Sequence, residues 1–287
     1  MIGVRICGTF SIIAMLFPRG FMGKIISVVN QKGGVGKTTT AINLSASIAL
    51  SGKKVLLIDM DPQANASSGL GIEADSRGIY ELLLGEASQE EVICSTEIET
   101  LKIIPSRVDL TGAEIELVSK ESREKVLKSA LNGVREEFEF VVIDCPPSLG
   151  LLTLNALAVS NSVLIPMQCE YYSLQGLSHL LKTLKLVKKS INPDLLVEGI
   201  LLTMYDGRTL LAAQVKDQVQ KYFSDFLLKT VIPRNVRLSE APSHGKPIML
   251  YAGCSRGADS YVELAKEIIS RSKFDERVNP SLKGSGV

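Results

Sequence analysis

A glycine-rich stretch near the beginning of the chain has the composition of a phosphate-binding loop. Residues 30–40 read NQKGGVGKTTT and lie between an apolar run and a segment of helical periodicity. Glycines at such a junction let backbone N–H groups turn inward around an anion, and the N-terminus of the following helix adds its dipole. The residues that we expect around the phosphates are Gly33, Gly34, Val35, Gly36, Lys37, Thr38 and Thr39.

Two side chains of this loop have a chemistry of their own. Lys37 is expected to contact the β- and γ-phosphates of a nucleotide, and Thr38 to supply a hydroxyl to Mg²⁺. The alternative is a glycine-rich turn that only begins a helix, but the apolar run before it and the helical pattern after it favour the phosphate loop. The loop departs from the usual GxxxxGK[ST] pattern, because Gln31 stands at the first glycine position and a second lysine, Lys32, follows it.

Aspartates follow two other apolar runs. Asp59 and Asp61 lie in KVLLIDMDPQANASSGLG, and Asp144 ends the apolar run of FEFVVIDCPPSLG. Ligands bind at the carboxyl ends of parallel strands, so these positions suit the magnesium side of a nucleotide site. Asp144 could instead begin a turn, and Asp59 or Asp61 could cap the helix that follows them.

The pattern along the rest of the chain predicts the elements that would position these residues. Short β-branched runs alternate with longer segments of helical periodicity, which is typical of an α/β fold with a mostly parallel, twisted sheet flanked by helices. We expect a single domain with about seven or eight strands. The runs that predict strands are residues 24–30, 54–59, 100–105, 138–144, 162–167, 198–205 and 226–233. The segments that predict helices are residues 38–50, 110–138, 151–158, 173–190, 209–223 and 258–272.

The two ends of the chain differ from the domain between them. The apolar stretch from Ile6 to Phe17 is too short to span a bilayer, and Met22 stands as a natural start immediately before the first predicted strand. We therefore interpret residues 1–21 as an extraneous or disordered N-terminal extension. Residues 22–273 form the predicted domain, and the polar residues 274–287 a flexible C-terminal tail.

Composition argues against some classes of protein. The chain has no Trp, 5% aromatic residues and a net charge of +1, unlike a nucleic-acid reader that stacks bases. So small a total charge gives the whole chain little attraction to DNA or membranes, and any such affinity must come from a local patch or from dimerisation. Five cysteines without a CxxC pair are typical of the reducing cytoplasm.

A series of motifs resembles one known family. In order, the chain reads KGGVGKT, DMDPQANASSGLG, VVIDCPPSLG, IPMQCEYYSLQG, LLTMYDGRT and IPRNVRLSEAPSHGKP. Together these segments resemble the ParA/Soj-type chromosome- or plasmid-partitioning ATPases of the ParA/MinD superfamily, whose phosphate loop is a deviant Walker A motif. The likeness extends from Met22 to about Lys273. It implies a P-loop NTPase domain that binds ATP and Mg²⁺ and hydrolyses ATP slowly until a partner stimulates it.

The resemblance also implies roles for individual residues. Lys32 would reach the nucleotide of a second protomer, so that ATP is sandwiched in a homodimer, while Lys37 would serve the protomer's own ATP. Asp61 would orient or polarise the attacking water, with Asp59 nearer the metal or in structural hydrogen bonds, and the division of roles between these two aspartates stays open. The implied magnesium ligands are Thr38, Asp59 and the Walker B aspartate Asp144. The residues implied near the base are Pro233, Arg234 and Asn235.

Two arginines are candidates for DNA contact. In Soj-like relatives, DNA binding depends on basic residues that the ATP-bound dimer displays, and two of these match Arg208 and Arg237. Such binding would be to non-specific double-stranded DNA and would weaken steeply with salt. The partner in relatives is ParB, which uses a basic N-terminal peptide, and we expect a ParB-type partner and a cytoplasmic, nucleoid-associated protein without stable membrane association. A row of lysines is interpreted as the solvated face of a helix: Lys182, Lys185, Lys188 and Lys189.

Other functions compete with this interpretation. A MinD-like ATPase shares the nucleotide site but binds membrane through a C-terminal amphipathic helix, and the tail KFDERVNPSLKGSGV has only a thin apolar face. A scaffold-type ATPase would position a protein complex rather than DNA, and the sequence discriminates it poorly. An iron protein would need paired interface cysteines, a pattern that Cys145 and Cys169 do not reproduce. A metabolic kinase or ligase would have no role for Lys32.

Overall fold

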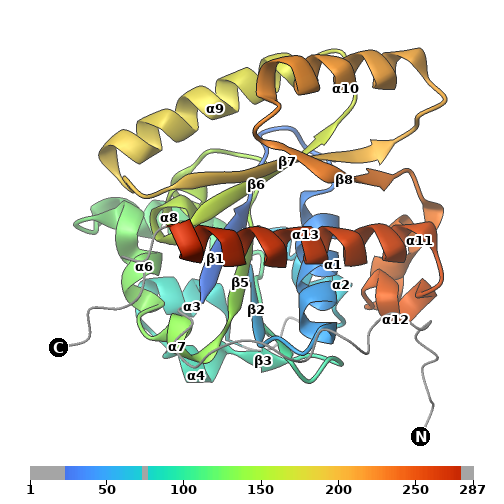
Figure 1. Cartoon of the computed structure of the whole chain (residues 1–287). Helices are drawn as coiled ribbons and strands as arrows, with labels where there is room; N and C mark the ends of the chain where they lie inside the picture. The colour runs from blue at the N-terminus through green and yellow to red at the C-terminus, as the bar shows by residue number, and fades with distance from the viewer. Residues whose placement is uncertain (1–22, 73–76, 279–287) are drawn as a thin grey trace, which may run out of the picture.

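The structure is a computed structural model that describes residues 23–72 and 77–278, with side chains as far as Ser272. The described residues form one α/β domain built on a sheet of eight strands (Figure 1), which confirms the predicted fold class. The strand order is β3-β4-β2-β5-β1-β6-β7-β8, and all pairings are parallel except that of β3 with β4. Residues 1–21, interpreted above as an extension, lie outside the described residues.

Each apolar run that predicts a strand coincides with one to within two residues at either end. The strands are β1 Lys24–Val28, β2 Val55–Asp59, β3 Cys94–Ser95, β4 Leu101–Ile104, β5 Phe140–Asp144, β6 Ser162–Gln168, β7 Leu196–Tyr205 and β8 Leu227–Pro233. The sequence pattern did not predict β3, because a two-residue edge strand is too short to show an apolar run or an alternation.

Helices cover both faces of the sheet (Figure 1). The α-helices are α1 Lys37–Leu50, α2 Asn65–Gly69, α3 Ile79–Leu84, α4 Gln89–Val92, α5 Leu110–Glu116, α6 Val126–Ala130, α7 Val134–Glu137, α8 Leu151–Val159, α9 Ser173–Ser190, α10 Leu210–Phe223, α11 Val236–Glu240, α12 Ile248–Ala252 and α13 Arg256–Val278. Short 3₁₀ turns lie at Leu117–Ser119, Arg123–Lys125 and Ala241–His244. The predicted helix of residues 173–190 has the bounds of α9.

The single long helix predicted for residues 110–138 is wrong. This segment is divided into α5, α6, α7 and two 3₁₀ turns. The backbone takes left-handed conformations at Ser122, with φ 52°, and at Gly133, with φ 86°, which interrupts a right-handed helix. Asn155 of α8 stabilises the broken path, since its side chain accepts a hydrogen bond from the Leu127 N–H and donates one to the Arg123 carbonyl. Tertiary hydrogen bonds therefore override the helical periodicity.

The C-terminal helix is longer than predicted. Helix α13 begins at Arg256 and continues to Val278, whereas the sequence pattern predicts a helix over residues 258–272. Along its described side chains Tyr261, Leu264 and Ile268 are buried against the sheet. A helix already formed by this packing extends into polar sequence at little cost, because each further residue adds a backbone hydrogen bond.

Side chains on alternate sides of the strands pack into two cores. On β2, Leu56 and Ile58 belong to the core that includes residues of α3, α8, α9 and α10. Val55 and Leu57 belong to the core that includes residues of α1, α12 and α13. Burial on both faces explains why these strands are apolar throughout rather than alternating.

Neighbouring strands in the middle of the sheet end beside one another. On β1, which lies between β5 and β6, Val28 pairs with Asp144 of β5, and Asp144 also pairs with Asp59 of β2. Because the strands are parallel, both aspartates stand at the carboxyl edge of the sheet, from which the loop 29–36 leaves β1. The topology thus brings together the phosphate-loop motif and the two aspartate motifs.

We predict that Gly78→Ala destabilises the domain. A Cβ at Gly78 would lie 2.3 Å from the backbone carbonyl oxygen of Pro105, which cannot move without shifting its segment. We expect the free energy of unfolding to fall by about 1–3 kcal/mol. Gly176→Ala on α9 is the matched control, because a Cβ there meets no atom within 4 Å and alanine favours a helix by about 0.5–1 kcal/mol. Urea unfolding checks both, and equal stability of the two variants would contradict the packing.

Candidate functional site

The loop between β1 and α1 is an open cradle. Gly34 and Gly36 have φ values of 73° and 84°, a left-handed conformation that glycine adopts without strain. A Cβ at Gly33 or Gly34 would meet no protein atom within 4 Å, so the space above the loop is free. The loop leads directly into α1, which begins at Lys37 and is 14 residues long. Open space at the N-terminus of a helix is suited to an anion such as phosphate.

The first part of the loop is fixed by Asn30. Its side-chain amide donates a hydrogen bond of 2.7 Å to the carbonyl of Pro166 on β6, and its Oδ1 accepts one of 3.0 Å from the backbone N–H of Lys32. Asn30 therefore ties the turn to the neighbouring strand. Residue type and spacing alone predict no role for Asn30, although it is the first residue of NQKGGVGKTTT.

The second part of the loop is held by side chains from β6 and β7. The Gln168 amide donates a hydrogen bond of 3.0 Å to the carbonyl of Gly34, and the Thr203 hydroxyl donates one of 2.8 Å to the carbonyl of Val35. Both residues lie in motifs quoted above, IPMQCEYYSLQG and LLTMYDGRT, but spacing alone could not show that they contact this loop. These bonds occupy loop carbonyls, which leaves the N–H groups for a ligand.

Lys37 points into the protein rather than into solvent. It is buried, and its ammonium donates a hydrogen bond of 3.3 Å to the carbonyl of Lys32. Burial lowers the pKa of Lys37, and the nearby carboxylates of Asp144 and Asp61 act in the opposite direction. A partly desolvated ammonium group at the base of an anion cradle is well placed to contact phosphate.

Asp59 is held by the chain itself. Its Oδ1 accepts a hydrogen bond of 3.1 Å from the Asp61 N–H, and its Oδ2 accepts bonds of 2.8 Å from both the N–H and the hydroxyl of Ser67. Burial nevertheless raises the pKa of Asp59 to about 6. Its hydrogen bonds fix the entry of the chain into α2, so a structural role is clear whether or not it also faces a metal.

Asp144 is the uncompensated charge of the site. Among the residues that the structure describes, neither of its carboxylate oxygens has a hydrogen-bond partner of acceptable geometry. Burial and then the charge of Asp59 raise the pKa of Asp144 well above its usual value, while the nearby hydroxyl of Thr38 and the ammonium of Lys37 lower it. An orphaned, fully buried carboxylate beside a second carboxylate has the chemistry that fits a cation.

The oxygen ligands of the site fit Mg²⁺ that is shared with a phosphate ligand, rather than a metal ion that protein side chains alone coordinate. Asp144 and Asp59 offer carboxylate oxygens and Thr38 a hydroxyl, which are the hard ligands that Mg²⁺ prefers. In the described part of the chain, no three His, Cys, Asp or Glu side chains are grouped to hold a metal by themselves. This agrees with the usual binding of Mg²⁺ through one or two carboxylates together with the phosphates of a substrate.

Asp61 lies at the edge of the same cluster. It is buried, its Oδ1 accepts a hydrogen bond of 3.0 Å from the Gln63 N–H, and its charge acts on Lys37 and on Asp144. Asp61 Oδ1 is thus engaged in a turn that precedes α2, whereas the aspartate that accepts a hydrogen bond from an N–H within that helix is Asp59. The structure brings Asp61 together with Lys37 and Asp144.

Lys32 is exposed to solvent, whereas Lys37 is buried. Its side chain is 45% exposed and forms an ion pair with Glu170, which is 51% exposed and follows β6. The ammonium of Lys32 therefore lies at the surface beside the loop and not in the interior of its own cradle. The two lysines of the motif face different surroundings.

The residues expected near the base lie at the carboxyl end of β8. Pro233 ends this strand opposite Tyr205 of β7, and the Arg234 N–H donates a hydrogen bond of 3.2 Å to the Tyr205 carbonyl. Asn235 caps α11, since its Oδ1 accepts a hydrogen bond of 2.8 Å from the Arg237 N–H. These three residues therefore lie at the same edge of the sheet as the loop. Asn235 also has a structural role, because it caps α11.

Both arginines expected to contact DNA are already paired. Arg208 is 89% exposed and binds both carboxylate oxygens of Asp206, at 2.8 and 2.7 Å. Arg237 is 59% exposed and lies 2.8 Å from Glu240. The ion pair with Arg208 lowers the pKa of Asp206 to about 2, so this carboxylate is charged at neutral pH. A phosphate would have to share these guanidinium groups with their acidic neighbours.

We predict that substitution by asparagine changes the free energy of unfolding more at Asp59 than at Asp144. Asp59→Asn places an amide N–H₂ against a backbone N–H in either orientation, and we expect the free energy of unfolding to fall by about 1–3 kcal/mol. Asp144→Asn keeps the shape of a side chain whose two oxygens have no hydrogen-bond partner of acceptable geometry in the described chain, so we expect a change below about 1 kcal/mol. Urea unfolding of the nucleotide-free protein checks this, and a larger loss for Asp144→Asn would contradict it.

Comparison with known proteins places the chain in a family. A family model described as an AAA domain matches residues 23–197. The chain is 60% identical over 249 residues to the sporulation initiation inhibitor protein Soj of Bacillus subtilis, covering 86% of this chain and 98% of that protein. It is 55% identical over 252 residues to the chromosome partitioning protein ParA of Myxococcus xanthus, covering 87% and 89%.

A solved structure shares the fold over nearly the whole domain. Cobyrinic acid a,c-diamide synthase from Mycobacterium smegmatis, solved with a bound ATP analog and magnesium, has a TM-score of 0.76 at 36% identity and covers 88% of this chain and 96% of that chain. The motifs, the topology and these identities agree. The chain therefore belongs to the Soj/ParA family of chromosome-partitioning ATPases.

Proposed function

We propose that the protein is an ATP-dependent dimerising ATPase that binds DNA without sequence preference and acts in chromosome or plasmid partitioning. The observation that carries this proposal is the divergence of the two loop lysines. Lys37 is buried at the base of the cradle, whereas Lys32 lies at the surface with only the exposed Glu170 as its ion-pair partner in the described chain. An ATPase that works alone has no use for a second lysine directed outward beside the phosphates.

ATP and Mg²⁺ are the ligands that the site fits. The backbone N–H groups of residues 33–39 would surround the phosphates, and Lys37 would contact the β- and γ-phosphates. Thr38, Asp59 and Asp144 would hold Mg²⁺, with Asp59 kept in orientation by its hydrogen bonds to Ser67. When bound, Mg²⁺ supplies positive charge that offsets the charge on the phosphates. The related synthase solved with an ATP analog and magnesium supports this choice.

Hydrolysis would depend on Asp61 and on the second protomer. Asp61, at the edge of the cluster, would orient the attacking water. Its Oδ1 accepts the Gln63 N–H, and Oδ2 accepts no hydrogen bond from the residues that the structure describes. The partner protomer's Lys32 would approach the γ-phosphate and offset the charge that develops in the transition state, as an arginine finger does. Catalysis would then require the dimer.

The surface around the loop supports such a dimer. Large side chains that follow the carboxyl ends of β6, β7 and β8 are exposed: Tyr171 by 75%, Tyr172 by 73%, Leu210 by 73% and Val236 by 69%. They share the sheet edge with Lys32, and exposed aromatic and aliphatic residues on one face are typical of an interaction surface. Their burial in a dimer would enclose the nucleotide between two protomers.

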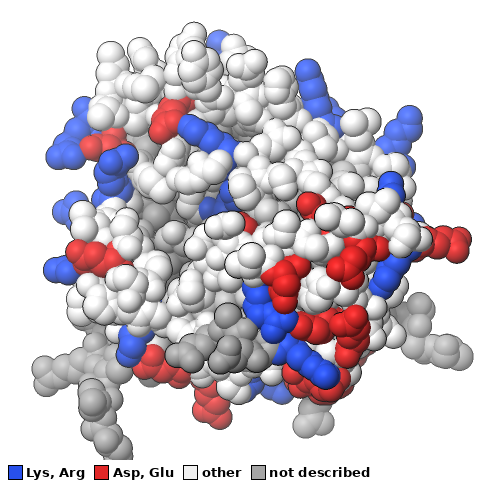
Figure 2. Space-filling model, turned by 180° about the vertical axis from the view of Figure 1, so that it is seen from behind, with Lys and Arg blue, Asp and Glu red and all other residues white. Residues whose placement is uncertain are grey.

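DNA binding would depend on the arrangement of charges in the dimer. Figure 2 shows Lys and Arg gathered at the left edge, scattered at the upper right and mixed with Asp and Glu in the lower centre of one face, without a continuous basic surface. Because Arg208 and Arg237 are paired with acids, one protomer would bind phosphate weakly, and two aligned copies would bind several phosphates. No helix in the described residues is long and apolar enough to cross a membrane. We propose the nucleoid as the site of action and a ParB-type protein as the stimulating partner.

We predict that duplex DNA of unrelated sequence binds with ATP and not with ADP or without nucleotide. Asp61→Ala should slow hydrolysis and prolong the bound state, and affinity should fall at least about tenfold between 50 and 200 mM salt. Arg237→Ala should weaken binding about fivefold or more, whereas Arg77→Ala, which removes another exposed ion pair, should not. Fluorescence anisotropy measures this. An ATP-dependent dimer that ignores DNA would overturn the proposal in favour of a scaffold-type or MinD-like positioning ATPase.

We predict that Glu170→Gln makes Lys32 more available to a partner. The ion pair is exposed, so its loss should shift the ATP-dependent dimerisation constant by about two- to fivefold towards the dimer. Glu97→Gln, which removes the exposed pair with Lys246, is the control and should have no effect. Sedimentation with a non-hydrolysable ATP analogue checks both variants. Weaker dimerisation of Glu170→Gln would show that Glu170 itself contributes to the interface.

A further inference from the structure

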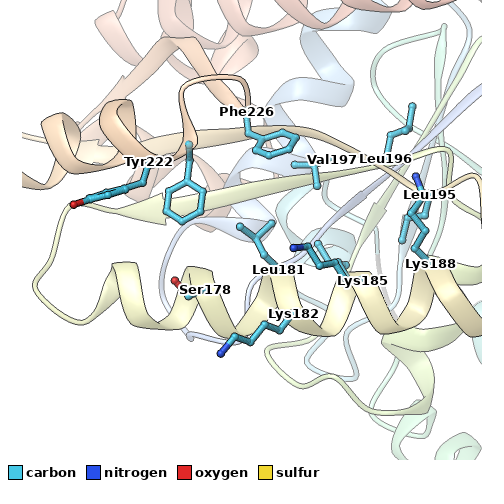
Figure 3. Close-up of a pocket in the computed structure, with 12 residues that line it drawn as sticks. Ser178, Leu181, Lys182, Lys185, Lys188, Leu195, Leu196, Val197, Tyr222 and Phe226 are labelled. Atoms are coloured by element: carbon cyan, nitrogen blue, oxygen red, sulfur yellow. The ribbon is translucent and has the colours of Figure 1, made fainter.

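An apolar groove lies between α9 and α10, above the first residues of β7. Its volume is 610 Å³, and its walls include Leu181 and Leu184 of α9, Phe223 of α10 and Val197 of β7. Figure 3 shows the side chains of Leu181 and Val197 facing one another across the groove, with the ring of Phe226 directed into it. The groove is thus lined by apolar groups from three elements.

Several large side chains of this groove remain open to solvent. Leu196 is 51% exposed, Tyr222 66% and Phe226 37%, and all three line the groove. Leaving apolar area in water costs free energy, so a contiguous apolar surface of this kind usually marks a place where something binds. Nothing in the nucleotide chemistry described above requires it.

Three lysines stand along the α9 side of the groove. Lys182, Lys185 and Lys188 line it and are exposed, and no ion pair joins any of them to an acid in the described part of the chain. Their stems contribute to the walls, and Figure 3 shows Lys182 extending outward from the helix. Spaced three residues apart, their Cα atoms follow one another at about 4.5 Å along the helix axis.

The groove is far along the sheet from the phosphate loop. Its floor is formed by Leu195, Leu196 and Val197, at the amino end of β7, whereas Thr203 near the carboxyl end of the same strand holds Val35 of the loop. A strand of ten residues separates these ends by about 30 Å. An occupant of the groove would therefore leave the nucleotide and the proposed dimer face uncovered.

We propose that this groove docks an acidic amphipathic helix of a partner protein. Apolar side chains at positions i, i+3, i+4 and i+7 of such a helix would enter the groove, and its Asp and Glu residues would pair with the lysines of α9. The charge complementarity commits the surface to an acidic partner. The basic peptide expected of a ParB-type protein would be repelled here, so this partner is a different one.

Other occupants fit the same surface less well. Duplex DNA would meet the lysines but would leave the apolar floor unfilled, because DNA is bound mainly through its phosphates. A fatty-acid anion would fill the floor but would engage one ammonium group rather than a row of three. These alternatives are arms of the test. The proposal does not depend on the function of the nucleotide site.

The test uses the full chain and labelled synthetic peptides. Three helix-forming acidic peptides carry Leu or Phe at the four apolar positions and Glu beside them, and a matched set carries Lys in place of Glu. Fluorescence anisotropy measures binding to the wild type and to the variant with Lys182→Glu, Lys185→Glu and Lys188→Glu. The control variant reverses three other exposed lysines, Lys54, Lys128 and Lys229.

We expect at least one acidic peptide to bind and the matched basic peptides to bind at least tenfold more weakly. The groove variant should lose at least tenfold in affinity for the acidic peptide, and Phe226→Ala at least threefold, while the control variant and the ATPase rate stay unchanged. Failure of all acidic peptides to bind overturns the proposal. So does equal binding to wild type and groove variant, or a groove variant whose defect is confined to duplex DNA or to a fluorescent fatty acid.

Discussion

A buried carboxylate that the fold does not neutralise controls the candidate site. Asp144 is fully buried, has no hydrogen-bond partner in the described chain and stands beside Asp59 on the adjacent strand. An ionised group in such a place is destabilised by the loss of water, which the raised pKa values of both aspartates reflect. The nearby ammonium of Lys37 offsets part of this charge, and a bound cation would offset more. A site of this kind couples the stability of the protein to the ligand that it binds.

The phosphate loop is open towards this charge because its supports lie behind it. Asn30 contacts β6, Gln168 holds the carbonyl of Gly34, and Thr203 of β7 holds that of Val35. All these bonds reach the loop from the sheet, and none crosses the space above Gly33 and Gly34. The central place of β1 makes this possible, since its neighbours on either side supply supports from β6 and carboxylates from β5. The strand order therefore determines which side chains surround the loop.

Sequence patterns predicted what depends on local composition. Glycines, a lysine and threonines after an apolar run predicted the loop, and seven apolar runs predicted seven of the eight strands. The long helix over residues 110–138 failed because Asn155, distant in sequence, holds a broken path. Asn30, Gln168 and Thr203 were missed for the same reason. Hydrogen bonds between distant segments leave no period in the sequence, and the ion pair of Lys32 with Glu170 follows only from the fold.

Surface charge is distributed differently from what residue types alone indicate. Arg208 and Arg237, the basic residues assigned to DNA, each stand against an acid, whereas the α9 lysines Lys182, Lys185 and Lys188, interpreted as an ordinary solvated face, have no acidic partner in the described chain. The net charge of +1 conceals both facts. Pairing lowers the attraction of the arginines for phosphate in one protomer, so the proposed affinity for DNA would require their repetition in an assembly. The lysines beside the apolar groove instead favour an acidic partner that also has an apolar surface. Helix α9 can then bind such a partner without competition from DNA.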